Sequence, residues 1–218
     1  MISVDHHASV VIVTDPNREL FIFNGYDDGY PVIPFRGFAN FLGGNADKGD
    51  ISPETILARE LGEELAVSRV AGGRDYAPID DITSLLSGIR SSVKAHADFL
   101  VQDPAVRALK PGRLRESVVS CYGSEIPVEL FEMASSHLKA GRKLVSEGIM
   151  YLSRREELLN GKRFLAWCSP VIFGHFLGEN IPNPHHAQAI PIGKIRDSFE
   201  KYGDFSYVLQ AGRANYNI

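Results

Sequence analysis

Apolar runs separated by turn-forming residues mark the first strands of the chain. Residues 8–14 form a β-branched apolar run, which is typical of a buried strand. An Asp-Pro-Asn turn follows, and residues 20–23 are the expected hairpin partner. Residues 25–40 are rich in Gly, Pro and aromatic side chains. They predict irregular loop or short strands, whose aromatic rings either pack in the core or stack on a nucleobase.

A short helix is predicted to begin at Pro53. Ser52 can cap this helix by accepting a hydrogen bond from the backbone amide near Thr55, and a proline in the first turn has no N–H to lose. Apolar positions recur at helical spacing and form a core-facing stripe at Ile56, Leu57, Leu61 and Leu65. Acidic positions lie three and four residues apart on another side, at Glu60, Glu63 and Glu64. The two faces therefore have different roles.

Further elements follow this helix. The periodicity of apolar residues predicts a long amphipathic helix over residues 79–103, which Pro104 ends. This helix lies in an expected insertion, at about residues 71–114, that would serve as a lid, a specificity element or a dimer surface. Residues 117–122 predict the next strand, and residues 127–138 predict a helix on which His137 is a surface residue with no evident partner.

The last third of the chain is less regular. The elements expected there are a strand, a short helix, an apolar segment and a final helix, at residues 145–152, 154–159, 164–176 and 194–202. Trp167 is the expected anchor of the apolar segment on the core. Residues from about 178 to 218 form a C-terminal extension, in which the adjacent His185 and His186 are expected to be loop residues because no acid or cysteine lies at ligand spacing.

Composition limits the class of protein. With 218 residues, of which 44% are hydrophobic, the chain is long enough for one sizeable core and short for two, so a single domain over residues 1–218 is expected. A net charge of −4 argues against nonspecific binding to a nucleic acid polymer. Cys121 and Cys168 are expected to be small buried residues. No apolar run approaches the roughly 20 residues that span a bilayer, so no membrane association is expected. We expect a soluble cytoplasmic protein.

The acidic face opposes the local stability of its helix. Glu60 and Glu64 are like charges at i,i+4, which costs an isolated helix about 0.2 to 0.5 kcal/mol, and Arg59 offsets only part of this cost. A hard divalent cation would offset it, because such ions prefer carboxylate oxygens. The alternative is an ordinary solvated helix face. The glycines at 43 and 44 favour the cation, since they let the backbone approach a ligand and let the Gly43 carbonyl join the coordination shell.

The whole segment resembles the signature box of the Nudix hydrolases. That pattern is Gly, five residues, Glu, seven residues, Arg-Glu, an aliphatic residue, any residue, Glu-Glu, any residue, Gly and an aliphatic residue. Here the box runs from Gly44 to Val67, and its metal-binding half, from Arg59 to Glu64, is intact. Three departures stand out: Asp50 replaces the first Glu, one extra residue precedes Arg59, and Ala66 replaces the closing Gly.

The resemblance implies an α+β fold, an α/β/α sandwich with a mixed sheet, which the helical insertion and the C-terminal extension elaborate. It also implies a hydrolase that cleaves the pyrophosphate of a nucleoside diphosphate linked to another group, so the expected partner is a small nucleotide derivative. Mg²⁺ or Mn²⁺ would be held by Glu60, Glu63, Glu64 and Gly43. Arg59 would brace the acids, and Glu60, Glu64 and the loop residue Glu147 compete for the role of general base.

Two other classes stay open. The irregular first half of the box is compatible with a nucleotide-binding sensor that has lost turnover. The acidic face is compatible with a scaffold that binds a basic protein. The long helix and the tail are also compatible with a homodimer.

Overall fold

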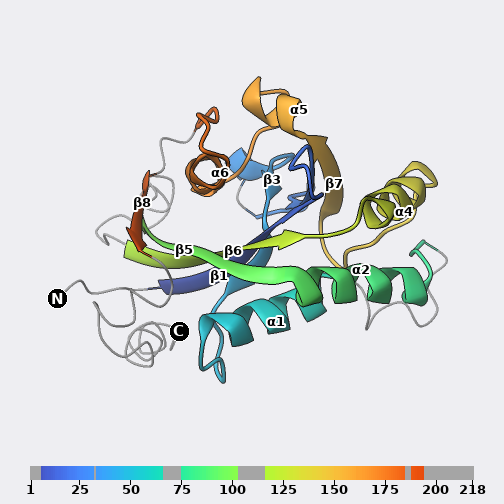
Figure 1. Ribbon diagram of the computed structural model, residues 1–218, viewed down its shortest axis with the longest axis horizontal. Helices are drawn as coiled ribbons and strands as arrows, with labels where there is room; N and C mark the ends of the chain where they lie inside the picture. The colour runs from blue at the N-terminus through green and yellow to red at the C-terminus, as the bar shows by residue number, and fades with distance from the viewer. Residues whose placement is uncertain (1–5, 32, 66–74, 103–115, 185–187, 194–218) are drawn as a thin grey trace.

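A mixed sheet of eight strands is the centre of the computed structural model (Figure 1), which describes residues 6–31, 33–65, 75–102, 116–184 and 188–193. The strands are β1 His6–Thr14, β2 Leu20–Gly25, β3 Ala39–Asn40, β4 Leu42–Asn45, β5 Val93–Gln102, β6 Glu116–Glu125, β7 Ile149–Arg154 and β8 Gln188–Gly193. The helices are η1 Ile33–Phe35, α1 Pro53–Glu64, α2 Ile79–Ser92, α4 Val128–Lys139, α5 Arg155–Leu159 and α6 Ser169–Leu177.

Strand β1 organises the sheet. The strand order is β3-β2-β1-β6-β5-β8, with β4 also paired to β1 and β7 to β2. Strand β1 runs parallel to β6 and antiparallel to β2 and β4. Its first half pairs with β4, where Ser9 lies opposite Gly44 and Val10 opposite Gly43, and its last residues pair with β2. The glycine pair is therefore held against the central strand.

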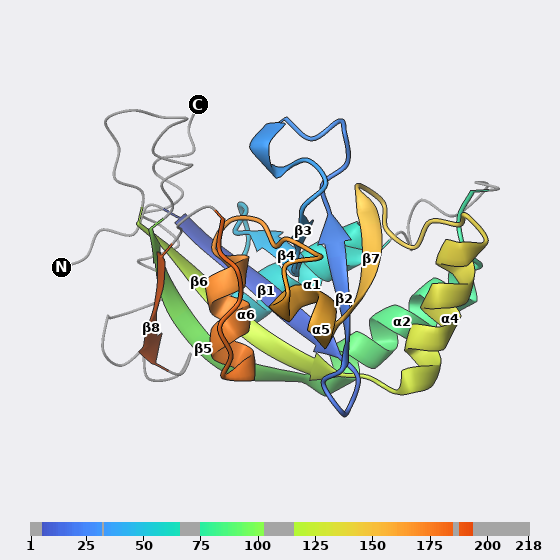
Figure 2. The same cartoon turned by 90° about the horizontal axis from the view of Figure 1, so that it is seen from above.

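Helices cover both faces of the sheet, so the predicted α+β sandwich with a mixed sheet is confirmed. Along β1, Val10 and Ile12 face one apolar core with α5 and α6, whereas Val11 and Val13 face a second core with α1, α2 and α4. Figure 1 shows α1 and α2 on one side of the sheet and α6 on the other, and Figure 2 looks onto the side that carries α5 and α6. The continuous apolar run of β1 follows from burial on both faces.

The predicted helix over residues 79–103 is wrong in its second half. Helix α2 ends at Ser92, and β5 begins at the next residue. From Ala97 onward the buried apolar side chains alternate, with Phe99 and Val101 on the same face. Strand β5 pairs with β6 along its length and with β8 on its other side. Pairing on both sides outweighs the helical spacing of its apolar residues. Residues 71–74 and 103–114 of the expected insertion lie outside the described residues.

Most other helices and strands predicted from the sequence are confirmed. Two predictions differ from the structure. The late strand begins at Ile149 instead of residue 145, because residues 146–148 form a bend in which Gly148 has a φ of 73°. His137 does have a partner: its Nε2 lies 2.7 Å from Oδ2 of Asp81, which joins α4 to α2. Both cysteines are buried, as expected.

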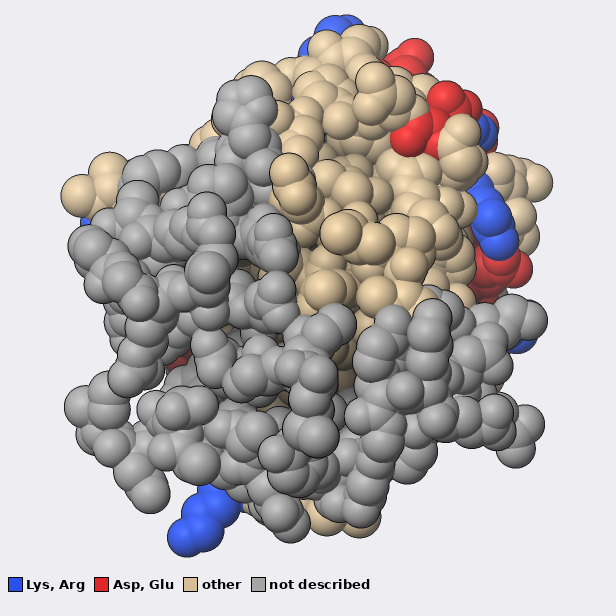
Figure 3. Space-filling model, turned by 90° about the vertical axis from the view of Figure 1, so that its left-hand side faces the viewer, with Lys and Arg blue, Asp and Glu red and all other residues tan. Residues whose placement is uncertain are grey.

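Parts of the C-terminal region lie outside the described residues. These parts are the expected helix over residues 194–202, the tail after it, and His185-His186. Among the helices that are described, none has the length and hydropathy needed to cross a membrane. Figure 3 views the molecule from the side of β8, and the described atoms on this face belong mostly to uncharged residues.

Candidate active site

The local sequence fixes the start of α1. The hydroxyl of Ser52 accepts a hydrogen bond from the Thr55 amide at 3.2 Å, and the Thr55 hydroxyl accepts one from the Ser52 amide at 3.0 Å. Pro53 occupies the first turn, as predicted. The apolar stripe of the helix, including Leu57 and Leu61, is buried in the core under β1 and β4. The opposite positions therefore direct the acidic side chains toward the glycine pair and the loop that follows it.

Arg59 ties the acidic face to the preceding loop. One guanidinium nitrogen, Nη2, lies 3.0 Å from Oδ2 of Asp50 and donates a 2.6 Å hydrogen bond to the carbonyl of Asn45. The other, Nη1, lies 2.9 Å from Glu60 and 3.0 Å from Glu63. Burial alone would lower the pKa of Arg59, but hydrogen bonding to Asp50 and the charge of Glu60 hold it above its usual value. Asp50 thus reaches the arginine although it is shorter than glutamate and its spacing is altered.

Glu64 is held by donors from two strands. Its Oε2 accepts a 2.7 Å hydrogen bond from the Gly43 amide on β4, and its Oε1 accepts a 3.1 Å bond from Nδ2 of Asn24 on β2. The residue keeps some exposure, but protein atoms surround its carboxyl group. This desolvation raises the pKa of Glu64 to about 8, although both hydrogen bonds act against the shift. The carboxyl group is therefore fixed in orientation beside the glycine pair.

Glu60 lies against the second glycine. A Cβ atom placed on Gly44 would be 2.5 Å from Oε2 of Glu60, so no larger residue fits while the carboxylate stays there. Gly43 is equally constrained, because its φ is 122° and a Cβ would lie 2.2 Å from the Ser9 carbonyl oxygen. Desolvation raises the pKa of Glu60, and Arg59 opposes that shift. Two carboxyl groups of α1 thus converge on one glycine pair.

The third acid behaves differently. The side chain of Glu63 is 61% exposed and forms an ion pair with Arg59. Within the described part of the chain, no three His, Cys, Asp or Glu side chains are grouped as a ready metal site. The chemistry of the donors still fits a hard divalent cation, because Glu60 and Glu64 supply carboxylate oxygens and Gly44 leaves the space that a Cβ would fill.

The loop of Glu147 lies at the end of α1. The Ser146 amide donates a 2.7 Å hydrogen bond to the Glu64 carbonyl, and the Ser146 hydroxyl donates one to the Glu63 carbonyl. Glu147 itself is exposed in the bend before β7. The fold therefore brings this loop next to the acidic residues, and a catalytic role for Glu147 stays a prediction.

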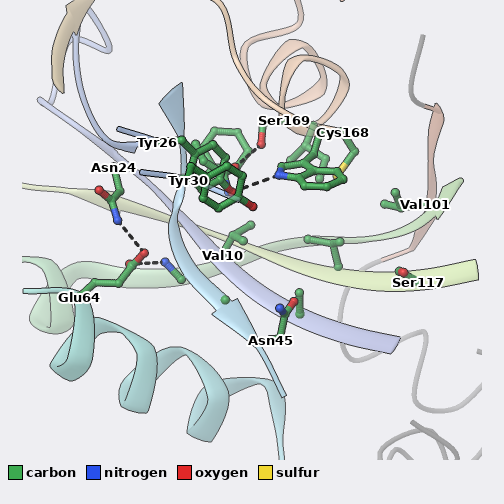
Figure 4. Close-up of a pocket in the computed structure, with 18 residues that line it drawn as sticks. Val10, Asn24, Tyr26, Tyr30, Asn45, Glu64, Val101, Ser117, Cys168 and Ser169 are labelled. Atoms are coloured by element: carbon green, nitrogen blue, oxygen red, sulfur yellow. Dashed lines mark hydrogen bonds between the residues drawn. The ribbon is translucent and has the colours of Figure 1, made fainter. Parts of the chain in front are cut away.

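A cavity of about 420 Å³ extends from Glu64 along the sheet toward α6 (Figure 4). The glycine pair and Asn24 border it near Glu64, and Val101 and Ser117 line it elsewhere. Tyr26 and Tyr30, in the aromatic segment singled out in the sequence, also line it. Sequence reasoning missed other polar groups of the wall, which include Asn24, Asn40 and Ser169. They come from separate parts of the chain, and no local pattern relates them.

Tyr26 is the centre of a hydrogen-bonded wall of this cavity. Its ring stacks on Tyr30 with centroids 3.7 Å apart. Its hydroxyl oxygen accepts hydrogen bonds from Nδ2 of Asn40 at 2.8 Å and from Nε1 of Trp167 at 3.1 Å. The Ser169 hydroxyl donates a 2.7 Å bond to Oδ1 of Asn40. Trp167 has a φ of 55°, a conformation that costs free energy for a bulky residue and persists only where its surroundings fix it.

Comparisons with known proteins give structural similarities only. No family model matches the chain. No curated protein matches its sequence. The dihydroneopterin triphosphate pyrophosphohydrolase of E. coli is 9% identical with a TM-score of 0.46, over 78% of this chain and 93% of that one.

Two other solved structures are similar at the same level. The Nudix hydrolase RenU of M. smegmatis is 7% identical with a TM-score of 0.43, over 83% of this chain and 90% of that one. The NUDIX domain of Shewanella oneidensis NrtR, complexed with ADP ribose, is 12% identical with a TM-score of 0.44, over 82% of this chain and 88% of that one. At these identities and TM-scores the similarities do not determine a function. The function is therefore inferred from the residues around Glu64.

Proposed function

We propose that the chain is a metal-dependent hydrolase of the Nudix type that cleaves the pyrophosphate linkage of a nucleoside diphosphate joined to another group. The observation that supports this most directly is the convergence of Glu60 and Glu64 on Gly43 and Gly44 at one end of the cavity. This arrangement joins a cluster of oxygen donors to a space that can hold the rest of a substrate.

Glu60, Glu63 and Glu64, with the carbonyl of Gly43, would hold Mg²⁺ or Mn²⁺. When bound, such an ion neutralises charge on the pyrophosphate and lowers the pKa of a coordinated water. Arg59 is a positioning residue: by engaging Asp50 and the Asn45 carbonyl, it fixes the loop against α1. Glu63 is free to turn toward a ligand because its side chain is largely exposed.

A carboxylate must accept the proton of the attacking water. Glu64 is the first candidate, because Gly43 and Asn24 orient its carboxyl group. Glu60 is the second candidate, and Glu147 is the third because its loop is anchored to the end of α1. Single substitutions to Gln, compared by their pH–rate profiles, would separate the base from residues that only hold the metal.

The test is a cleavage assay over a panel of dinucleotides, nucleotide sugars and nucleoside triphosphates with Mg²⁺ or Mn²⁺, read by the masses of the products. We expect cleavage that falls about 100-fold or more in Glu60→Gln and Glu64→Gln. Glu129→Gln is the matched control, because Glu129 is an exposed acid on α4, away from α1. Cleavage that survives both substitutions in α1 would rule out this site as the catalytic centre.

A nucleotide-binding sensor without turnover is the second candidate. It is favoured by the ion pairs of Arg59 with both Glu60 and Glu63, which engage two of the three proposed carboxylate ligands. Binding of panel members without cleavage at any metal concentration would support the sensor.

A further inference from the structure

The cavity beside Glu64 is suited to an uncharged part of a ligand. Among the described residues that line it, Glu64 is the one acidic residue, and none is Lys or Arg. The described part of this wall offers a phosphate group no cation to pair with. Most of the wall is apolar or aromatic, with Val10, Val119 and Ile172 from β1, β6 and α6. The charged part of a substrate therefore belongs at the Glu64 end, and an apolar planar group fits the remainder.

Aromatic side chains provide surfaces for stacking. Tyr26, Tyr30 and Trp167 all line the cavity, and Figure 4 shows the stacked rings of Tyr26 and Tyr30. The Tyr26 hydroxyl joins Asn40 and Trp167 through two hydrogen bonds. Rings that are fixed before binding lose little conformational entropy when a ligand stacks on them.

Asn40 supplies hydrogen-bonding capacity in the same wall. A primary amide has two N–H donors and an oxygen with two lone pairs. Nδ2 of Asn40 donates one hydrogen bond to the Tyr26 hydroxyl, and Oδ1 of Asn40 accepts one from the Ser169 hydroxyl. In either orientation of the amide, one N–H and one lone pair remain. Asn40 lines the cavity, so this donor and this acceptor are available to a ligand.

We propose that Asn40 is the specificity-determining residue of this cavity and pairs with the edge of an uncharged planar heterocycle, of the kind found in nucleobases, that carries a donor beside an acceptor. Side-chain amides make such paired hydrogen bonds with complementary base edges. This inference rests on the proposed function, which orients the substrate in the cavity with its phosphates toward Glu64. It adds the residue that distinguishes one heterocycle from another.

The test measures binding of free nucleosides without metal. Trp167 is the sole tryptophan of the chain, so its fluorescence reports on the cavity. Each nucleoside is compared with an analogue that lacks the acceptor at its pairing edge, such as adenosine with its 7-deaza derivative. We expect wild type to discriminate within at least one such pair by about ten-fold, as loss of a hydrogen-bond pair predicts.

The variant Asn40→Asp keeps the size of the side chain and removes its N–H donors. We expect it to lose the ten-fold discrimination while stacking still quenches Trp167. Asn160→Asp, at an exposed position that ends α5, is the matched control and keeps the wild-type discrimination. If Asn40 had only a structural role, Asn40→Asp would weaken the binding of all nucleosides by the same factor. That result would overturn the proposal.

Failure of this proposal and failure of the proposed function have different outcomes. Nucleosides that bind with discrimination by Asn40, without any cleavage in the metal assay, would keep this inference and remove the hydrolase. Cleavage of pyrophosphates with no binding of any nucleoside, or with no discrimination between paired analogues, would keep the hydrolase and overturn the role of Asn40.

Discussion

The backbone amide of Gly43 donates a 2.7 Å hydrogen bond to the carboxyl group of Glu64. This bond joins β4, which is paired to the central strand, to the last residue of α1. A carboxyl group that is desolvated and yet fixed by a backbone donor is a common feature of functional sites. The relationship places the acids of α1 at the entrance to a cavity that the sequence did not predict.

Replacing Gly44 by Ala should disturb Glu60 without unfolding the protein. The added Cβ would lie 2.5 Å from Oε2 of Glu60, so the carboxylate must move away from the glycine pair. We expect Mg²⁺ affinity, measured by calorimetry, to fall about ten-fold or more. Gly62→Ala is the control, because its Cβ would meet only the end of the Arg90 side chain at 3.3 Å. Equal metal affinity in both variants would contradict the proposed ligand.

Asp50→Asn should loosen the brace on Arg59. The carboxylate of Asp50 is buried, with 7% of its side chain exposed, and it pairs with a guanidinium that is 26% exposed. We expect a loss of roughly 1 to 3 kcal/mol in the free energy of unfolding, measured with urea, because the amide cannot match the charge-assisted bonds. Asp28 is exposed, and Asp28→Asn should change the free energy of unfolding by less than about 0.5 kcal/mol. A stability loss no larger than that of the control would show that Asp50 does not brace the arginine.

A divalent cation should stabilise the folded chain through α1. At a Mg²⁺ concentration 100 times its dissociation constant, the gain would be about 2.7 kcal/mol. We expect the melting temperature to rise with Mg²⁺ or Mn²⁺ in wild type and Glu129→Gln, and to respond far less in Glu64→Gln. An unchanged melting temperature in wild type across millimolar concentrations of both ions would contradict metal binding.

His96 should make stability depend on pH. Its Nε2 lies 3.1 Å from Nδ1 of His175, and burial, then His175 and Arg18, lower the pKa of His96 in the folded protein. The unfolded chain, with a histidine pKa of about 6.5, therefore takes up a proton that the folded chain resists, and stability falls as the pH drops through that value. His96→Gln should reduce this loss between pH 7.5 and 5.5 in urea titrations. Identical slopes for the two proteins would exclude the contribution.

Phe173 should anchor α6 and, with it, the wall of the cavity. Its ring is fully buried and meets Phe21 edge-on, with centroids 4.8 Å apart. We expect Phe173→Ala to cost about 3 to 5 kcal/mol in the free energy of unfolding. The exposed Val128→Ala on α4 should cost far less. A similar loss in both variants would mean that α6 contributes little to the core.

Local sequence was sufficient for the acidic helix and unreliable for the strand beside it. Ser52 and Pro53 start α1, and its apolar stripe orients the acids, because all of these interactions lie within two or three turns. The sequence of β5 predicts a helix because its apolar residues fit both periods. Its state depends on β6 and β8, which follow it in the chain.

The sequence by itself determined that Glu60, Glu63 and Glu64 share a helix behind a glycine pair. Only the tertiary structure decided that Glu60 and Glu64 converge on the glycines while Glu63 stays largely exposed. It also brought Asn40 beside Trp167 and Ser169, more than 100 residues along the chain. The reason is physical: helix caps and periodicity act between near neighbours, whereas a cavity wall forms where strand pairing and core packing join distant segments.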